Sequence, residues 1–251
     1  NLIGIKLNEP DEYEQFQSDL VVYHDDFGDY STNEPTMDGT ASLVYLLAAF
    51  DSRTAAAPQI EVITDAGAVI RGSREEKKIA LVFTADEYAE GASIITAALK
   101  KNAVPASFFL TGRFYENPKF KTLIKALKAD HHYLGAHSDQ HLLYCDWAQR
   151  DSLLIDENAF HKDLEANYKK MGKFGIKPAD AHIFLPPYEW HNQQIADWTN
   201  QVGLTLINYT PGTRSNADYT WPEMGKSYRS SAEIYQSIVD YEAKDKDGLN
   251  G

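Results

Sequence analysis

The sequence predicts an α/β protein built on a parallel sheet or barrel from residue 77 onwards. One observation is that short apolar runs alternate with longer amphipathic segments, which is typical of repeated βα units. The other is that three of these runs lead into polar clusters: TADE at 84–87, HSDQH at 137–141 and LPPYEW at 185–190. Because the ends of parallel strands meet at one rim, where such folds place their chemistry, we expect the clusters to lie together.

The elements follow from this alternation. The expected strands cover 79–83, 106–110, 133–136, 181–185 and 204–209, and the expected helices cover 91–101, 118–129, 157–171, 192–202 and 231–243. Pro118 suits a first helical turn, and Gly203 suits a helix C-cap, since each residue matches the backbone that its position requires. Ser231 lies near the N-cap of the last helix.

The N-terminal part does not follow the alternation. Residues 1–55 predict a short, mainly helical segment with an apolar helix at 41–50. Residues 56–76 contain Pro58, small residues and an IEVI run, which we interpret as a linker or a capping strand. The remaining residues, 77–251, are predicted to form one domain.

Composition limits the classes of partner. Of the 251 residues, 43% are hydrophobic, which is enough for a sizeable core, and no apolar run is long enough to cross a membrane. The net charge of −13 argues against nucleic acid and anionic membranes, because both require a basic surface. Cys145 is the single cysteine, which excludes an internal disulfide. Neutral or weakly charged glycans fit these properties better.

Two histidines of the second cluster suggest a metal site. His137 and His141 are four residues apart, which on a helical turn places both imidazoles on one face. Asp86 and Glu87 follow an earlier strand, so the ligand set becomes two histidines and one carboxylate, with positions open for water and substrate. The second carboxylate is then free to act as a base.

The three clusters together resemble the polysaccharide deacetylases, which are carbohydrate esterase family four and carry the NodB-homology domain. That family has TFDDG, HxxHH or HSxxH, and RxPY motifs at strand ends; here TADE stands for TFDD, HSDQH matches the histidine motif and FLPPYEW stands for FRPPYG. The resemblance covers about two thirds of the chain, from residue 77 on. It implies a distorted (β/α) barrel, a divalent metal, and hydrolysis of N- or O-acetyl groups on sugars, without indicating which.

The resemblance assigns Glu87, His137 and His141 as metal ligands and Asp86 as the base. Zinc is the expected metal, with cobalt or nickel as alternatives. Leu185 stands where the family has an arginine that orients the base. We therefore expect Asp86 to lack an ion-pair partner and its pKa to rise relative to other members.

The third cluster is expected to bind substrate. By the resemblance, the backbone N–H of Tyr188 stabilises the oxyanion, and Tyr188, Trp190 and Trp221 contact an acetylated glycan. Glu189 replaces a glycine of the motif, so we assign it a catalytic role as a reserve base.

Both ends of the chain depart from a single deacetylase domain. The first 55 residues resemble the C-terminal end of glycoside hydrolase family nine, where Asp25 matches a signature aspartate and Glu34, in YSTNE, matches the general acid. At the other end, the sequence stops before the strand that carries the family's acid histidine in an LxH motif. We expect a piece of a longer protein, fused to a glycosidase and secreted, periplasmic or on the cell surface of a bacterium.

A second hypothesis belongs to another class. The replaced arginine, the TADE variant and the missing acid histidine are also compatible with a carbohydrate-binding module descended from the esterase. Such a module binds glycan without releasing acetate.

Overall fold

The computed structural model describes residues 62–75 and 77–251. Our expectations for the N-terminal segment, which include the helix at 41–50 and the roles of Asp25 and Glu34, lie outside the described residues. None of the helices within the described residues is long and apolar enough to span a membrane.

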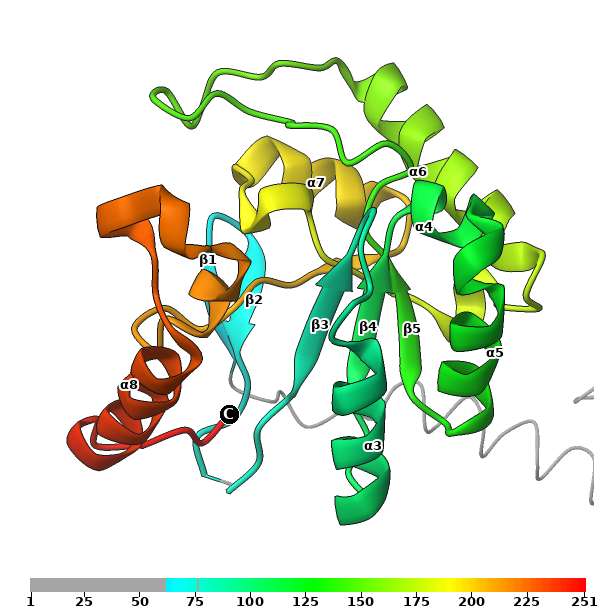
Figure 1. Cartoon of the computed structure of the whole chain (residues 1–251). Coiled ribbons are helices and arrows are strands. Elements are labelled where there is room, and N and C mark those ends of the chain that lie inside the picture. Colours follow the sequence, from blue (N-terminus) through cyan, green and yellow to red (C-terminus); the bar gives the residue numbers. More distant parts are fainter. Residues whose placement is uncertain (1–61, 76) are drawn as a thin grey trace, which may run out of the picture. The chain divides into compact units, whose positions relative to one another are not determined.

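The centre of the fold is a five-stranded parallel sheet with flanking helices, which confirms the predicted fold class (Figure 1). The sheet has the strand order β3-β4-β5-β6-β7, so successive strands are neighbours throughout. The strands are β3 (Val82–Ala85), β4 (Ser107–Leu110), β5 (Tyr133–Ala136), β6 (Ile183–Phe184) and β7 (Thr205–Leu206). Because all of them run in one direction, their carboxyl ends lie at one rim.

The helices lie close to their predicted ranges. They are α3 (Ala92–Asn102), α4 (Gly112–Glu116), α5 (Lys121–Ala129), α6 (Glu157–Gly172), α7 (Gln193–Gln201) and α8 (Ser231–Lys244), with short 3₁₀ turns η2 (Pro118–Phe120), η3 (Pro178–Asp180), η4 (Pro187–Glu189), η5 (Ser215–Tyr219) and η6 (Pro222–Ser227). Among the α-helices of residues 62–75 and 77–251, only α4 was missed, because five residues are too few for a helical period to show in the sequence.

The strands differ more from the prediction. β3 begins at Val82, three residues later than expected, and β6 and β7 are each only two residues long. β3 is the edge of the five-stranded sheet, so it pairs on one side only, and Ile79 and Leu81 before it are 56% and 36% exposed. By contrast, Phe108, Phe109 and Leu110 of β4 are all buried, as expected for a parallel strand that is covered on both faces.

A two-stranded antiparallel hairpin, β1 (Ile63–Asp65) and β2 (Ala68–Arg71), precedes the sheet. Its turn residues, Ala66 and Gly67, both have positive φ, which is the turn geometry that matches hairpin twist. β2 continues the sheet beyond β7, since Val69 pairs in parallel with Ile207. The segment predicted as a linker or capping strand therefore includes a strand that packs beside the sheet.

Arg71 fixes the C-terminal residues next to this hairpin. Its guanidinium is buried and donates to the carbonyls of Gly248 and Asn250, at 2.6 and 2.7 Å. The backbone of Gly251 in turn bonds to Gly72 and Lys78, at 3.2 and 3.0 Å.

Candidate active site

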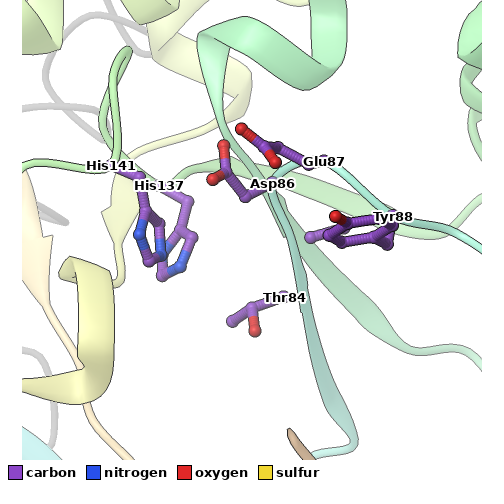
Figure 2. A pocket seen from close by; sticks show the side chains of 7 residues that line it. Thr84, Asp86, Glu87, Tyr88, His137 and His141 are labelled. Carbon is purple, nitrogen blue, oxygen red and sulfur yellow. The ribbon is translucent and has the colours of Figure 1, made fainter.

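A pocket at the carboxyl ends of β3 and β5 joins two of the three predicted clusters (Figure 2). Its lining consists of Thr84, Ala85, Asp86, Glu87, Tyr88, His137 and His141. The third cluster lies next to it, because the ring of Tyr188 packs edge-on against His141 with centroids 4.4 Å apart. The expectation that the clusters gather at one rim is therefore confirmed.

His137 is fixed as a neutral imidazole. Its ring is buried, and Nδ1 lies 2.8 Å from the carbonyl oxygen of Leu185. A carbonyl can only accept, so Nδ1 carries the proton and the lone pair is on Nε2. Burial, and secondly the neighbouring His141, lower the pKa of His137 to about 3. A neutral imidazole held by a carbonyl is the form that binds metal ions.

His141 reaches the pocket from a loop, so the helical turn assumed from the spacing is wrong. Ser138 and His141 both have left-handed backbone, with φ of 70° and 55°. The loop nevertheless brings the rings of His137 and His141 to a centroid distance of 5.1 Å. Burial lowers the pKa of His141, although Asp86 acts in the opposite direction. Such backbone in non-glycine residues costs about 1–3 kcal/mol each, which the contacts around the loop must offset.

Helix α6 supplies two residues that hold this loop and that the sequence analysis missed. The buried carboxylate of Asp163 accepts hydrogen bonds from the amides of Asp139 and Gln140, both at 3.1 Å. The side-chain oxygen of Asn167 accepts from the amide of His137 at 2.9 Å. Two polar residues four apart on the buried face of an amphipathic helix were the signal that could have identified them.

Arg113, at the start of α4, holds both carboxylates of the TADE cluster. Its Nε donates to Asp86 Oδ1 at 3.0 Å, a second nitrogen of the guanidinium bonds the other oxygen of Asp86, and the third lies 3.2 Å from Glu87 Oε1. The hydroxyl of Thr111 also donates to Asp86 Oδ1, at 2.9 Å. The expectation that Asp86 lacks an ion-pair partner because Leu185 replaces the arginine is therefore wrong.

A glycine connects this arginine to the histidine loop. The amides of Gly112 and Arg113 donate to the carbonyls of Ser138 and Asp139, at 3.0 and 3.1 Å. A Cβ at Gly112 would lie 1.7 Å from Oδ1 of Asp139, so no larger residue fits there without movement of the loop. The turn after β4 therefore ties the carboxylates of the first cluster to the histidines of the second.

The donors fit a divalent ion in type, since two neutral imidazoles and two carboxylates line one pocket. Their arrangement is not that of a filled site. Within residues 62–75 and 77–251, no three His, Cys, Asp or Glu side chains are placed to hold a metal ion. The carboxylates of Asp86 and Glu87 are ion-paired with Arg113 instead, and Figure 2 shows them standing apart from the two imidazole rings.

The turn η4 carries Tyr188, whose ring contacts His141, and Glu189, which does not line the pocket. Both residues have positive φ, 62° and 49°. The hydrogen bonds of the turn use the amides of Glu189 and Trp190, so the amide of Tyr188 takes no part in them. Burial, and secondly Asp218 of η5, raise the pKa of Glu189 to about 7. Glu189 is not among the residues that line the pocket, and its role as a reserve base stays a prediction.

Of the two predicted substrate-binding tryptophans, the structure places Trp190 near the pocket. Trp190 stacks on Trp147, with centroids 5.6 Å apart, and Trp147 meets Tyr188 edge-on at the same distance. Trp221 precedes η6, is 56% exposed and lies outside this group of rings. Trp147 was missed because it follows the histidine cluster without any motif of its own.

Residues 71–207, more than half of the chain, match the family described as polysaccharide deacetylase. Among solved structures, the chain is similar to a pseudoenzyme of the CE4 family from Bacillus anthracis, with a TM-score of 0.55 and 17% identity over 70% of this chain and 55% of that chain. It is also similar to the chitin deacetylase of the fungal pathogen Colletotrichum lindemuthianum, with a TM-score of 0.53 and 16% identity over 75% and 76% of the two chains.

A third similar structure is the peptidoglycan N-acetylglucosamine deacetylase Bc1960, with a TM-score of 0.53 and 17% identity over 68% of this chain and 70% of that chain. At these identities the likeness shows the fold alone. The chain spans 55% of the wild-type Bacillus anthracis pseudoenzyme chain and 57% of the chain of a mutant of that protein. Among curated protein sequences, none matches the chain.

Proposed function

The chain belongs to the polysaccharide deacetylase family, and on this basis we propose that it removes acetyl groups from a polysaccharide or oligosaccharide by metal-assisted hydrolysis. The observation that carries the proposal is the pocket itself, which brings Asp86, Glu87, His137 and His141 together from two different strand ends. Two neutral imidazoles beside two carboxylates provide ligands and a base at one place.

We assign His137, His141 and Glu87 as the residues that would hold a divalent ion, with zinc first and cobalt or nickel as alternatives. When bound, such an ion lowers the pKa of a water molecule and polarises the acetyl carbonyl. The hydrogen bond from His137 to the carbonyl of Leu185 keeps the Nε2 lone pair available. Asn167 and Asp163 support the same loop from α6.

Asp86 is the proposed base, which takes a proton from the attacking water. Arg113 and Thr111 hold its carboxylate, so its orientation is set before substrate arrives. The N–H of Tyr188 is the proposed donor to the oxyanion, a contribution that in comparable sites is worth ~3–4 kcal/mol. The contact of its ring with His141, which lines the pocket, supports this assignment. Such prepositioned groups avoid reorganisation during the reaction.

The proposal is tested by measuring acetate release from acetylated xylan, an O-acetyl substrate, and from a chitooligosaccharide, an N-acetyl substrate, with zinc, cobalt or nickel added. Metal content is measured on the same protein. Acetate release from one substrate, together with about one bound metal per chain, would support the proposal. Metal-independent release, or none from either substrate, would contradict it.

One observation favours the second candidate function, a glycan-binding module with impaired catalysis. Both carboxylates are ion-paired with Arg113, which competes with a metal ion for them. If this arrangement persists with metal present, the protein would bind glycan without hydrolysing it. Calorimetric titration with the same two glycans separates the functions, since a module gives binding without acetate.

A further inference from the structure

Exposed aromatic rings continue outwards from the candidate active site. We call Tyr188, Trp147 and Trp190 the aromatic strip. It begins at His141, against which Tyr188 packs, and passes to Trp147 and then Trp190. Trp147 and Tyr188 are 57% and 46% exposed, so large ring surfaces face solvent directly beside the pocket. Adjoining exposed apolar rings of this kind usually mark a binding surface.

The loop that carries Trp147 is ordered by its own hydrogen bonds. The side chain of Asp146 accepts from the amides of Ala148 and Gln149, both at 2.8 Å. The carbonyl of Asp146 accepts from the indole N–H of Trp190 at 3.2 Å. The backbone on both sides of Trp147 is therefore held by hydrogen bonds, and little conformational entropy of the loop is lost when a ligand covers the ring.

The ring of Trp190 also contacts a cation. The guanidinium of Arg150 lies 5.0 Å from the centre of the Trp190 ring, and it is tied to Asp65 at 2.9 Å. Trp190 thus acts as a support, while the neighbouring Trp147 and Tyr188 keep exposed ring surface. The contact surface of the strip is made by these last two residues.

We propose that Trp147 and Tyr188 form a sugar-binding subsite that takes the unit next to the acetylated one in a glycan chain. This proposal rests on the proposed function and deepens it. Flat aromatic rings with exposed faces suit the C–H faces of pyranose rings, and rigid aromatics contribute contact area at small entropic cost. The strip starts at a ring that touches His141, so a bound glycan would run from the pocket along it. An uncharged glycan also suits a chain with net charge −13.

The experiment compares wild type, Trp147→Ala and Trp147→Phe. The control is Tyr235→Ala, which removes a 68% exposed aromatic ring from α8. Each protein is assayed for acetate release on a sugar-free aryl acetate, on an acetylated monosaccharide and on acetylated tetrasaccharides of the xylan and chitin types. Binding of both tetrasaccharides is measured separately by calorimetry.

We expect Trp147→Ala to lower kcat/KM on the tetrasaccharide that is used about tenfold, through KM, which corresponds to ~1.4 kcal/mol. Its rates on the aryl acetate and the monosaccharide should not change, and Trp147→Phe should keep most of the activity. An equal loss on all substrates would show a structural role and overturn the subsite, as would an unchanged tetrasaccharide rate.

The binding measurement separates failure of the subsite from failure of the proposed function. If the wild type releases no acetate, the proposed function fails. The subsite then stands if Trp147→Ala weakens tetrasaccharide binding about tenfold while Tyr235→Ala does not. Absence of binding of both tetrasaccharides to the wild type would overturn it.

Discussion

Replacement of Arg113 tests whether the ion pair to Asp86 orients the base. The guanidinium makes two hydrogen bonds to Asp86 and an ion pair to Glu87. A hydrogen bond to a charged group contributes ~1.5–3 kcal/mol, whereas an exposed ion pair contributes ~0.2–1 kcal/mol. The side chains of Arg113 and Asp86 are 38% and 22% exposed, so we expect about 1–2 kcal/mol, between the two ranges. Arg113→Ala should then lower kcat about 5- to 30-fold with little change in KM.

The assay is acetate release from an aryl acetate at saturating substrate. Arg113→Lys should fall between wild type and Arg113→Ala, because lysine keeps the charge without the planar fork. Added guanidinium should restore part of the rate of Arg113→Ala, which a folding defect would not allow. Arg74→Ala, which breaks the distant ion pair to Asp247, is the matched control and should keep full activity. Unchanged kcat in Arg113→Ala, or an equal loss in Arg74→Ala, would refute the reasoning.

Three further predictions concern individual side chains. His137→Ala should abolish stoichiometric zinc, cobalt or nickel binding in calorimetry, whereas the exposed His182→Ala should not; unchanged affinity in His137→Ala would show that the ligand set is wrong. Asp86→Asn should keep the metal but lower acetate release by ~10²–10⁴-fold, and an undiminished rate would shift the role of base to Glu189. Because the pKa of Glu189 is raised to about 7 in the folded state, the folded protein binds this proton more tightly than the unfolded chain. The resulting stabilisation is complete at low pH and is lost as pH rises from 4.5 to about 7. Between pH 4.5 and 8, urea unfolding should therefore show wild type losing about 1–2 kcal/mol more than Glu189→Gln, and identical pH profiles would contradict the assigned pKa.

The fold could be predicted from the sequence where a periodic pattern of hydrophobic residues extends over several turns. α6 was predicted as 157–171 and is Glu157–Gly172, because sixteen residues display several helical turns. The edge strand β3 was misplaced by three residues, since the apolar residues before it suggested a strand that has no partner on one side. Apolar composition alone does not show how far the hydrogen-bonded pairing of two strands extends.

The residues of the site that belong to sequence motifs could be predicted, whereas the residues that support them could not. Asp86, Glu87, His137 and His141 were found because polar residues at strand ends are visible in one dimension. Contacts made across the sheet were not visible. Asn167 bonds a backbone amide 30 positions away, and Arg113 bonds the carboxylate of Asp86, 27 positions away, so the roles of both depend on tertiary geometry.

We propose that Arg113 takes the place of the motif arginine, and the order of the strands supports this. Asp86 follows β3, and Arg113 follows the adjacent strand β4, whereas Leu185 follows β6, three strand spacings or ~14 Å along the sheet. Leu185 is only 3% exposed, and its contact with His137 uses its carbonyl, which any residue at this position can provide. An apolar side chain there adds to the core without removing a support from the histidine. On this proposal the base keeps a cationic partner despite the departure from the motif, and the choice between enzyme and binding module depends on whether Asp86 and Glu87, held by Arg113, act on a bound glycan.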